Sequence, residues 1–461
     1  MNPEFRRLMI VEFQGHRLIA MPTVLAVVFG LGYYLNDYRW DTSTGFMATL
    51  GYFALVFIWG TRQAAESVIQ EINTKTWPPQ RMSSMSAWGL AWAKLAGSTA
   101  FTWAGGIVCL AVYGASNAEW WDGPRIATSV ALYLGAGVLA QTVCFLASLA
   151  AIQRRREFGR VHVVAYQFLG LVFALPPLYI GLSVTGGAGL LDLIIWYDYY
   201  LALPQFMLIF MGLFIVWGLA GAWALMRVEL QEPLGPWLWL TFVIFTMAFF
   251  GGMRSVPIGP DTPVALMDFP SIPTMVLSIG IVMIYVIGLM ETKNRFRLRQ
   301  WDALIHQRQW RSFSRFAPRS LLSLPVVAAA TVIAASAFAD YTAARAHDLH
   351  IVFAAALLFT TRDLGFIYWI CLGRTDGRGE AMAAVMLALV YIAVPGVLFQ
   401  ISAHVHPAIS YLTAFFAPAT ELPSWWNIAA PASECLFIGM AIRLRWKSAI
   451  AAPVAASASQ R

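Results

Sequence analysis

The stretch Tyr200–Met226 reads YLALPQFMLIFMGLFIVWGLAGAWALM and contains no charged side chain. A helix that crosses the hydrocarbon core of a bilayer needs about 20 mostly apolar residues. Only helices and closed barrels satisfy their backbone hydrogen bonds in lipid, and an apolar run of this length is typical of a helix. The stretch therefore predicts a membrane-spanning helix.

The same pattern recurs along the whole chain. Of the 461 residues, 59% are hydrophobic and only 12% are charged, and a soluble core cannot hide so much apolar surface. We therefore predict an all-α integral membrane protein with about twelve transmembrane helices. The other spans lie near Leu18–Asn36, Gly45–Gly60, Leu95–Ser116, Ile126–Ile152, Val161–Val184, Pro236–Gly252, Ile272–Met290, Leu321–Ala339, Leu349–Leu372, Ala381–Ser402 and Trp426–Ile442.

The distribution of basic residues predicts the orientation of these spans. With both termini in the cytoplasm, 26 of the 31 Lys and Arg residues lie inside, four lie outside, and Arg362 lies within a span. Cytoplasmic loops carry such an excess of basic residues. The net charge of +7 is then explained by topology and by attraction to anionic lipids, so no nucleic-acid partner is expected.

The chain divides near residue 230 into two sections of six predicted spans. Residues 1–230 begin with a basic amphipathic stretch, Phe5–Arg17, which predicts an interfacial entry helix without a cleavable leader. Residues 231–448 carry a second long cytoplasmic loop, Glu291–Arg319, rich in arginine. The tail, residues 449–461, consists mostly of Ala and Ser and is expected to be disordered. No residue-level repeat relates the two sections.

The first long cytoplasmic loop, residues 62–94, is the most polar segment between spans. Arg62 and Glu66, like Glu71 and Lys75, have the i,i+4 spacing that supports a helix projecting from the second span. Thr76 and Pro78-Pro79 are expected to end it, and a second short helix over Ser84–Lys94 would lead back to the membrane. A solvated helical hairpin without a partner fits the spacing equally well.

Side chains of this loop follow an order similar to that after the second span of type 2 (exporter-type) ABC transporter permeases. The similar positions are Glu71, Thr76, Ser84, Ser86, Trp88 and Lys94. The sequence departs from the family pattern at Lys75 and Ala93, where the family usually has Gly, and at Ser84, where it has Pro. The resemblance covers residues 1–230 and does not extend to residues 231–461.

The resemblance implies that the loop is a coupling element that grips a separate cytoplasmic ATPase. The positions carried over for this role are Glu66, Glu71, Thr76, Arg81 and Lys94. It further implies an exporter in a bacterial cytoplasmic (inner) membrane. Two assemblies are compatible with it: a pair of permease subunits, identical or different, or a fused permease in which Glu291–Arg319 forms a second docking loop.

No Gly-x-x-x-x-Gly-Lys-Ser/Thr phosphate loop occurs in the sequence. The chain is therefore expected to be a transport subunit with no enzymatic activity or cofactor of its own. Mg-ATP would bind to the partner ATPase. Apart from that ATPase, the expected partners are membrane lipids and a second permease subunit.

Arg362 and Asp363 lie near the middle of the predicted span Leu349–Leu372. A charge at mid-bilayer costs at least about 2.5 kcal/mol, so both side chains should face the protein interior or a wet cavity. Adjacent residues point about 100° apart on a helix and need not pair with each other. Two interpretations follow: a charge on a substrate pathway, or a structural ion network.

The fifth span contains Pro176-Pro177, which should bend or interrupt the helix. The apolar run Leu190–Tyr200 after it carries Asp192 and Asp198. This run predicts either a re-entrant or surface-lying external segment or an ordinary outer loop.

Three other functions are alternatives to the permease. An ion-coupled secondary transporter with two six-span halves could use Arg362 and Asp363. A membrane glycosyltransferase or polysaccharide ligase would need outer-loop carboxylates, but Asp192, Asp198, Asp261 and Asp340 form no spaced motif. Metal binding is not expected: the four cysteines lie inside spans without ligand spacing, and His347, His350, His404 and His406 fit a polar outer surface better than a metal site.

Overall fold

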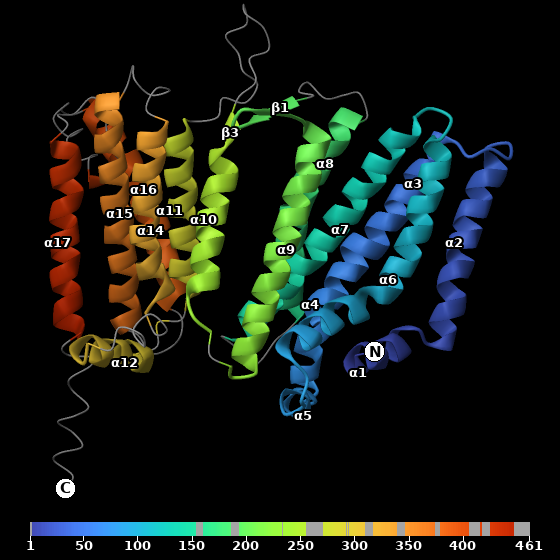
Figure 1. Cartoon of the computed structure of the whole chain (residues 1–461), viewed down its shortest axis with the longest axis horizontal. Helices are drawn as coiled ribbons and strands as arrows, with labels where there is room; N and C mark the ends of the chain where they lie inside the picture. Colours follow the sequence, from blue (N-terminus) through green and yellow to red (C-terminus); the bar gives the residue numbers. More distant parts are fainter. Residues whose placement is uncertain are drawn as a thin grey trace, which may run out of the picture. The chain divides into compact units, whose positions relative to one another are not determined.

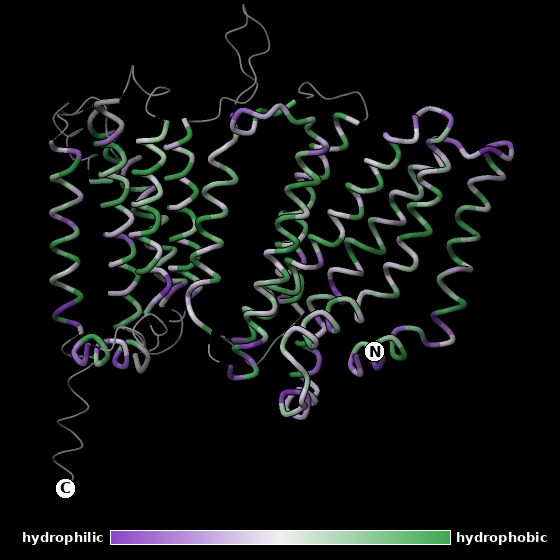
Figure 2. The backbone as a smooth tube through the Cα atoms, viewed as in Figure 1, coloured by the Kyte–Doolittle hydropathy of each residue, from purple (hydrophilic) through white to green (hydrophobic). Residues whose placement is uncertain are grey.

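The chain is a multi-pass, helical membrane protein. The computed structural model describes residues 2–153, 160–185, 193–232, 234–254, 271–291, 293, 295–308, 317–338, 346–373, 379–404, 415–416 and 425–446. Within this part, ten helices are long and apolar enough to cross a membrane. Along the helices that Figure 1 labels, Figure 2 shows hydrophobic residues over most of the length and hydrophilic residues gathered near the ends.

The helices form two compact units, Met1–Ile194 with Asp198–Leu234, and Ile195–Tyr197 with Gly235–Arg461. The elements of the first unit are α1 (Pro3–Glu12), α2 (Gly15–Leu35), α3 (Thr42–Tyr52), the π-helix η1 (Phe53–Gly60), α4 (Thr61–Asn73), α5 (Trp77–Arg81), α6 (Ala87–Asn117), α7 (Gly123–Ile152), α8 (Arg160–Thr185), β2 (Tyr199–Ala202) and α9 (Leu203–Glu229). Strand β1 (Leu193–Trp196) precedes β2.

The second unit contains α10 (Trp237–Gly251), β3 (Met253–Arg254), α11 (Ile272–Met290), α12 (Arg295–His306), α14 (Arg319–Ala337), α15 (Ala346–Gly373), α16 (Gly379–His404) and α17 (Trp426–Trp446). Within it, Ile195 and Trp196 of β1 pair antiparallel with Arg254 and Met253 of β3. Helix α15 packs along α17, and α11 packs along α14. Their contact faces hold the core of this unit, which includes Val243, Leu277, Val327 and Leu364.

Polar side chains define where the helices near the N-terminus begin. The Asn2 side chain accepts a hydrogen bond from the backbone of Glu4 at the start of α1. Ser86 does the same for Gly89 at the start of α6. Such N-caps satisfy backbone donors that have no partner inside the helix. Helix α1 therefore begins at a fixed point beside α6, on which it packs.

The second span differs from a regular α-helix in its middle. Its helix runs from Thr42 to Asn73 and adopts π geometry over Phe53–Gly60. Glutamines on neighbouring helices bind its carbonyl groups: Gln141 donates to Val56 at 3.2 Å and Gln167 donates to Ile58 at 2.9 Å. A π segment changes the spacing of backbone hydrogen bonds, and these side chains satisfy the exposed oxygens in a region without water.

The predicted loop 62–94 is more buried than its polarity indicates. Helix α4 buries Ala64, Ala65, Val68 and Ile69 in the core of the first unit. These positions share one face of a helix, and that face packs against α7 and α8. The expectation of a solvated hairpin over this whole loop is therefore wrong for α4.

Three local predictions within the first unit are corrected. Pro78-Pro79 do not end the preceding helix, which stops at Asn73. They occupy the first turn of α5, where a backbone N–H would have no partner inside the helix, so the N–H that proline lacks is not missed. The expected separate helix over Ser84–Lys94 is the beginning of the continuous α6. Pro176-Pro177 lie inside α8 without interrupting it.

The external run Leu190–Tyr200 has local structure that the sequence analysis did not predict. Its described residues form strand β1 and the start of β2 rather than a re-entrant segment. Alternating Ile, Trp and Tyr side chains favour extended structure here. The sixth span consequently starts at Leu203, after β2, and not at Tyr200.

Close packing of α7 and α8 predicts an asymmetry between two helical glycines. A Cβ atom at Gly170 would lie 2.5 Å from the carbonyl oxygen of Ala140, whereas a Cβ at Gly212 would meet nothing within 4 Å. We expect Gly170→Ala to lower the free energy of unfolding by about 1–3 kcal/mol. Gly212→Ala should leave it unchanged or raise it by about 0.5–1 kcal/mol. Thermal unfolding of both variants in the same detergent checks this, and equal melting temperatures would contradict the packing.

Candidate functional site

Lys94 is the most deeply buried charged side chain of the first unit, with no exposed surface. It lies two turns into α6, where that helix contacts both α1 and α4. Its ammonium group also lies 5.6 Å from the ring centroid of Trp77, close enough for a cation–π contact. An unpaired charge at such a position would be strongly unfavourable, so its hydrogen-bond partners decide whether it is tolerated.

All three donors of the Lys94 ammonium group have partners. It donates to Glu4 at 2.6 Å, to Gln80 at 2.7 Å, and to Glu71. These partners come from α1, α5 and α4, respectively. A lysine has three N–H donors, so the group is fully satisfied. One side chain of α6 thereby joins three other helices.

Arg7 completes the charge balance of this cluster. Its guanidinium donates to both carboxylate oxygens of Glu4, at 2.9 and 2.6 Å, and to Glu71. Gln80 donates its amide N–H to Glu71 at 2.9 Å. Two basic and two acidic groups therefore meet in one hydrogen-bonded cluster with no net charge. We call Glu4, Arg7, Glu71, Gln80 and Lys94 the Lys94 cluster.

The electrostatics of the cluster affect the pKa of Glu4. Burial alone would raise the pKa of its carboxyl group, but hydrogen bonds from Arg7 and Lys94 and the positive charges of both outweigh burial. The net result is a pKa below the ordinary value for glutamate. The ionised form of Glu4 is thus the one that the folded state favours.

The residues expected to couple to an ATPase fall into two groups, one buried in the Lys94 cluster and one at least partly exposed. Glu71 and Lys94 are buried in the cluster, whereas Glu66 pairs with Arg62 on α4 at 3.0 Å as expected. The hydroxyl and the backbone N–H of Thr76 donate to the carbonyl oxygen of Glu71, at 3.3 and 2.9 Å. Arg81 ends α5 and is partly exposed.

The predicted Glu71–Lys75 pair is wrong. Lys75 lies beyond the end of α4 with a φ of 59°, so it no longer follows the helix face on which Glu71 lies. Glu71 instead contacts Lys94 and Arg7. Three members of the cluster, Glu4, Arg7 and Gln80, were not identified as site residues from the sequence. An acidic residue in the first turn of an otherwise basic amphipathic helix was the available signal for Glu4.

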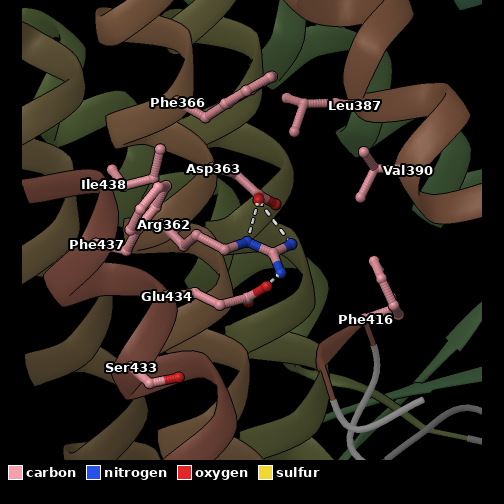
Figure 3. Close-up of a pocket in the computed structure, with 10 residues that line it drawn as sticks. All are labelled: Arg362, Asp363, Phe366, Leu387, Val390, Phe416, Ser433, Glu434, Phe437 and Ile438. Carbon is pink, nitrogen blue, oxygen red and sulfur yellow. Dashed lines mark hydrogen bonds and ion pairs between the residues drawn. The ribbon is translucent and has the colours of Figure 1, made fainter. Parts of the chain in front are cut away.

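A second charged cluster lies inside the second unit, around Arg362 of α15. Arg362 and Asp363 are buried and do pair, with Nε of Arg362 donating to Asp363 at 2.8 Å (Figure 3). Arg362 also donates to Glu434 of α17 at 2.5 Å and to the Tyr391 hydroxyl of α16 at 2.7 Å. Long side chains thus overcome the angular separation of adjacent helix positions.

Aromatic hydroxyl groups complete the shell around Asp363. Tyr285 of α11 and Tyr391 each donate to its second carboxylate oxygen. Glu434, Tyr285 and Tyr391 were not singled out from the sequence, although Glu434 is an acidic residue inside a predicted span. That feature is the signal that could have identified it, since intramembrane acids are rare.

The structure describes only part of the other predicted acidic and histidine positions. Asp198 is exposed between β1 and β2, and Asp192, Asp261, Asp340 and His406 lie outside the described residues. In the described part of the chain, no group of three or more His, Cys, Asp or Glu side chains could hold a metal ion.

Comparison with known proteins identifies no relative of this chain. No family model, no curated protein and no solved structure matches the chain. The two clusters and the helices that carry them are therefore the features from which the function is inferred.

Removing the charge of Lys94 should destabilise the first unit. Lys94→Met leaves Glu4 and Glu71 buried with Arg7 as their only cationic partner, and breaking a buried pair in this way costs about 3–5 kcal/mol. Lys75→Met is the matched control, because Lys75 is exposed beyond the end of α4. The check is thermal unfolding of both purified variants, and an unchanged melting temperature for Lys94→Met would contradict the cluster.

The low pKa of Glu4 predicts acid sensitivity. A carboxyl group whose pKa is lower in the folded state stabilises the protein above its unfolded pKa, about 4.3, and this stabilisation disappears as the pH falls through the folded value. Melting temperatures should therefore fall between about pH 5 and pH 3. In Glu4→Gln the decrease should be smaller. Parallel curves for the two proteins would show that Glu4 does not contribute.

Proposed function

We propose that the chain is the permease subunit of an ABC transporter, an exporter. It would be driven by a separate cytoplasmic ATPase that docks around α5, in the middle of the 62–94 segment. The Lys94 cluster is the observation that carries the proposal. It connects α5, at the tip of this segment, directly to the head of α6 and to α1. A force on α5 would be transmitted to a membrane-spanning helix without a flexible link.

The tip of the segment offers a surface for docking. Thr76, Pro78, Pro79, Met82 and Ser83 are all exposed, and the side chain of Met82 is 82% exposed. Short helix α5 lies at the end of the first unit beyond α4, as Figure 1 illustrates. The buried Glu71 and Lys94 would act behind this surface, as positioning residues, while Glu66, Thr76 and Arg81 are accessible to a partner.

We infer twelve spans in this permease. Ten helices meet the length and hydropathy of a span, and α10 and α17 supply the other two. Helix α10 is short, with 15 residues, but carries no charged side chain. Helix α17 has 21 residues and its only basic residues, Arg443 and Arg445, lie in its last turn. With twelve spans both termini would lie on the same side of the membrane, and the excess of basic residues favours the cytoplasmic side of a bacterial inner membrane.

Coupling would work as a shift between two packings of the same helices. Mg-ATP would bind to the partner ATPase and change the position of its docking surface. Because the donors of Lys94 are saturated by three helices, α1, α4, α5 and α6 would move as one body. Such rigid-body motion can bias the spans between inward-open and outward-open states.

A second candidate function is an ion-coupled secondary transporter centred on Arg362 and Asp363. The observation that favours it is a cavity of about 350 Å³ beside these residues in the second unit. Mid-membrane charges at a cavity are typical of ion-coupled transporters. The exposed, tightly anchored helix α5 has no role in that mechanism, which is why the permease is preferred.

The permease proposal predicts the effect of one substitution at the tip. Met82→Asp places a charge on an exposed apolar side chain outside the core, so folding should be unaffected. We expect a co-purifying ATPase to be lost from the solubilised chain, together with its ATP hydrolysis. Affinity purification from the native host, with identification of bound proteins and an ATPase assay, is the measurement.

Trp120→Asp is the matched control. Trp120 is 69% exposed and lies past the opposite end of α6 from α5. It should retain the ATPase. If the unmodified chain is reproducibly recovered without any ATPase, the proposal is wrong and the secondary transporter becomes the better account.

A further inference from the structure

The cavity beside Arg362 has an apolar wall and a charged floor. Its volume is about 350 Å³, and Figure 3 shows the charged groups turned toward one another at one side of it. This volume lies in the range of small-molecule sites. Apart from the three charged residues and Ser433, six apolar side chains line the cavity: Phe366, Leu387, Val390, Phe416, Phe437 and Ile438.

Neither Arg362 nor Asp363 has a hydrogen-bonding position left for a ligand. The five N–H donors of Arg362 go to Asp363, Glu434, Tyr391 and the carbonyl oxygen of Phe415. One oxygen of Asp363 binds the guanidinium and the other accepts two tyrosine hydroxyl groups. These two residues are therefore the supporting structure of the cavity and not its binding groups.

Glu434 differs from both. One of its carboxylate oxygens, Oε2, accepts from Arg362 at 2.5 Å, and within the described residues its other oxygen has no hydrogen-bond partner. The side chain is 27% exposed, and it lines the cavity. It therefore presents a free acceptor oxygen to whatever occupies the space.

The charges of the cluster do not balance. Within the described residues, one guanidinium faces two carboxylates. The other side chains of the cluster are neutral: the Tyr391 hydroxyl accepts from Arg362, and the hydroxyl groups of Tyr285 and Tyr391 donate to Asp363. An excess negative charge within the membrane favours a counter-cation. A bare metal ion would need several oxygen ligands, whereas this cavity offers mostly aromatic and aliphatic surface.

We propose that this cavity binds an amphiphilic organic ammonium ion, with the ammonium group donating to Oε1 of Glu434 and the apolar body lying against the phenyl rings. The ring faces add a cation–π attraction. The same chemistry is present in a free hydrophobic amine and in a lipid with a primary ammonium headgroup. The inference concerns the second unit alone and goes beyond the proposed coupling to an ATPase.

The test uses the full chain in nanodiscs of phosphatidylcholine, with 4-phenylbutylammonium as the probe and 4-phenylbutanol as its neutral analogue. Equilibrium dialysis measures the affinity for each. We expect saturable binding of the ammonium probe and about tenfold or more weaker binding in Glu434→Gln. The neutral alcohol should bind the two proteins equally, because it lacks the charge that Glu434 recognises.

Two further variants separate recognition from misfolding. Val390→Trp adds bulk to an apolar lining position and changes no charged group, so it should weaken binding of both compounds. Glu380→Gln removes an acidic residue of α16 that does not line the cavity, and it should change neither affinity. Equal binding of the ammonium probe to the unmodified protein, Glu434→Gln and Val390→Trp would overturn the proposal.

A final binding measurement, in nanodiscs of a different lipid composition, identifies the source of the ligand. Adding phosphatidylethanolamine to the nanodiscs displaces the probe if the lipid headgroup occupies the site. Undiminished binding in that bilayer assigns the site to a free amine.

Discussion

The cost of an unpaired charge away from water governs both parts of this protein. Lys94 and Arg362 are each buried among helices, and each is stable only because carboxylates and neutral polar groups from other helices surround it. The helices cannot separate without exposing these groups to lipid or leaving them unsatisfied. Each cluster therefore fixes how its helices pack, in addition to the apolar contacts between them.

The two clusters differ in charge balance and in how many of their hydrogen-bonding groups have a partner. In the Lys94 cluster, charges balance and every donor of the lysine has a partner, which suits an element that transmits force. Around Arg362, the guanidinium and Asp363 are saturated, but one oxygen of Glu434, which lines a cavity, has no hydrogen-bond partner in the described part of the chain. That incompleteness suits a group that meets a ligand. Similar residue types thus support different roles because of one additional, unbalanced carboxylate.

Long apolar runs made most of the helices predictable, since a bilayer allows few alternatives for such segments. Ile272–Met290, for example, was predicted with the bounds that α11 has. The local sequence was a poorer guide to irregular elements. The π segment at Phe53–Gly60 and the strands at Leu193–Ala202 depend on neighbours elsewhere in the chain, such as Gln141 for the former and Met253 for the latter.

The site residues divide in the same way. Lys94, Glu71, Arg362 and Asp363 were identified because charges near or within apolar spans are rare, but their partners were not. Which face of α1 meets α6, and which face of α17 meets α15, depends on tertiary packing that a single sequence does not encode in a local pattern. Glu4, Gln80 and Glu434 were missed for this reason, and Glu71 was assigned to Lys75, four residues away, instead of Lys94.

The central claim is that a separate ATPase contacts the tip of the 62–94 segment. The most direct measurement places a photo-crosslinking amino acid at position 83, which is exposed beside α5, and irradiates native membranes. Mass spectrometry of the adducts should identify a polypeptide with a Gly-x-x-x-x-Gly-Lys-Ser/Thr phosphate loop. Adducts with lipid alone, or with proteins that lack this loop, would contradict the account.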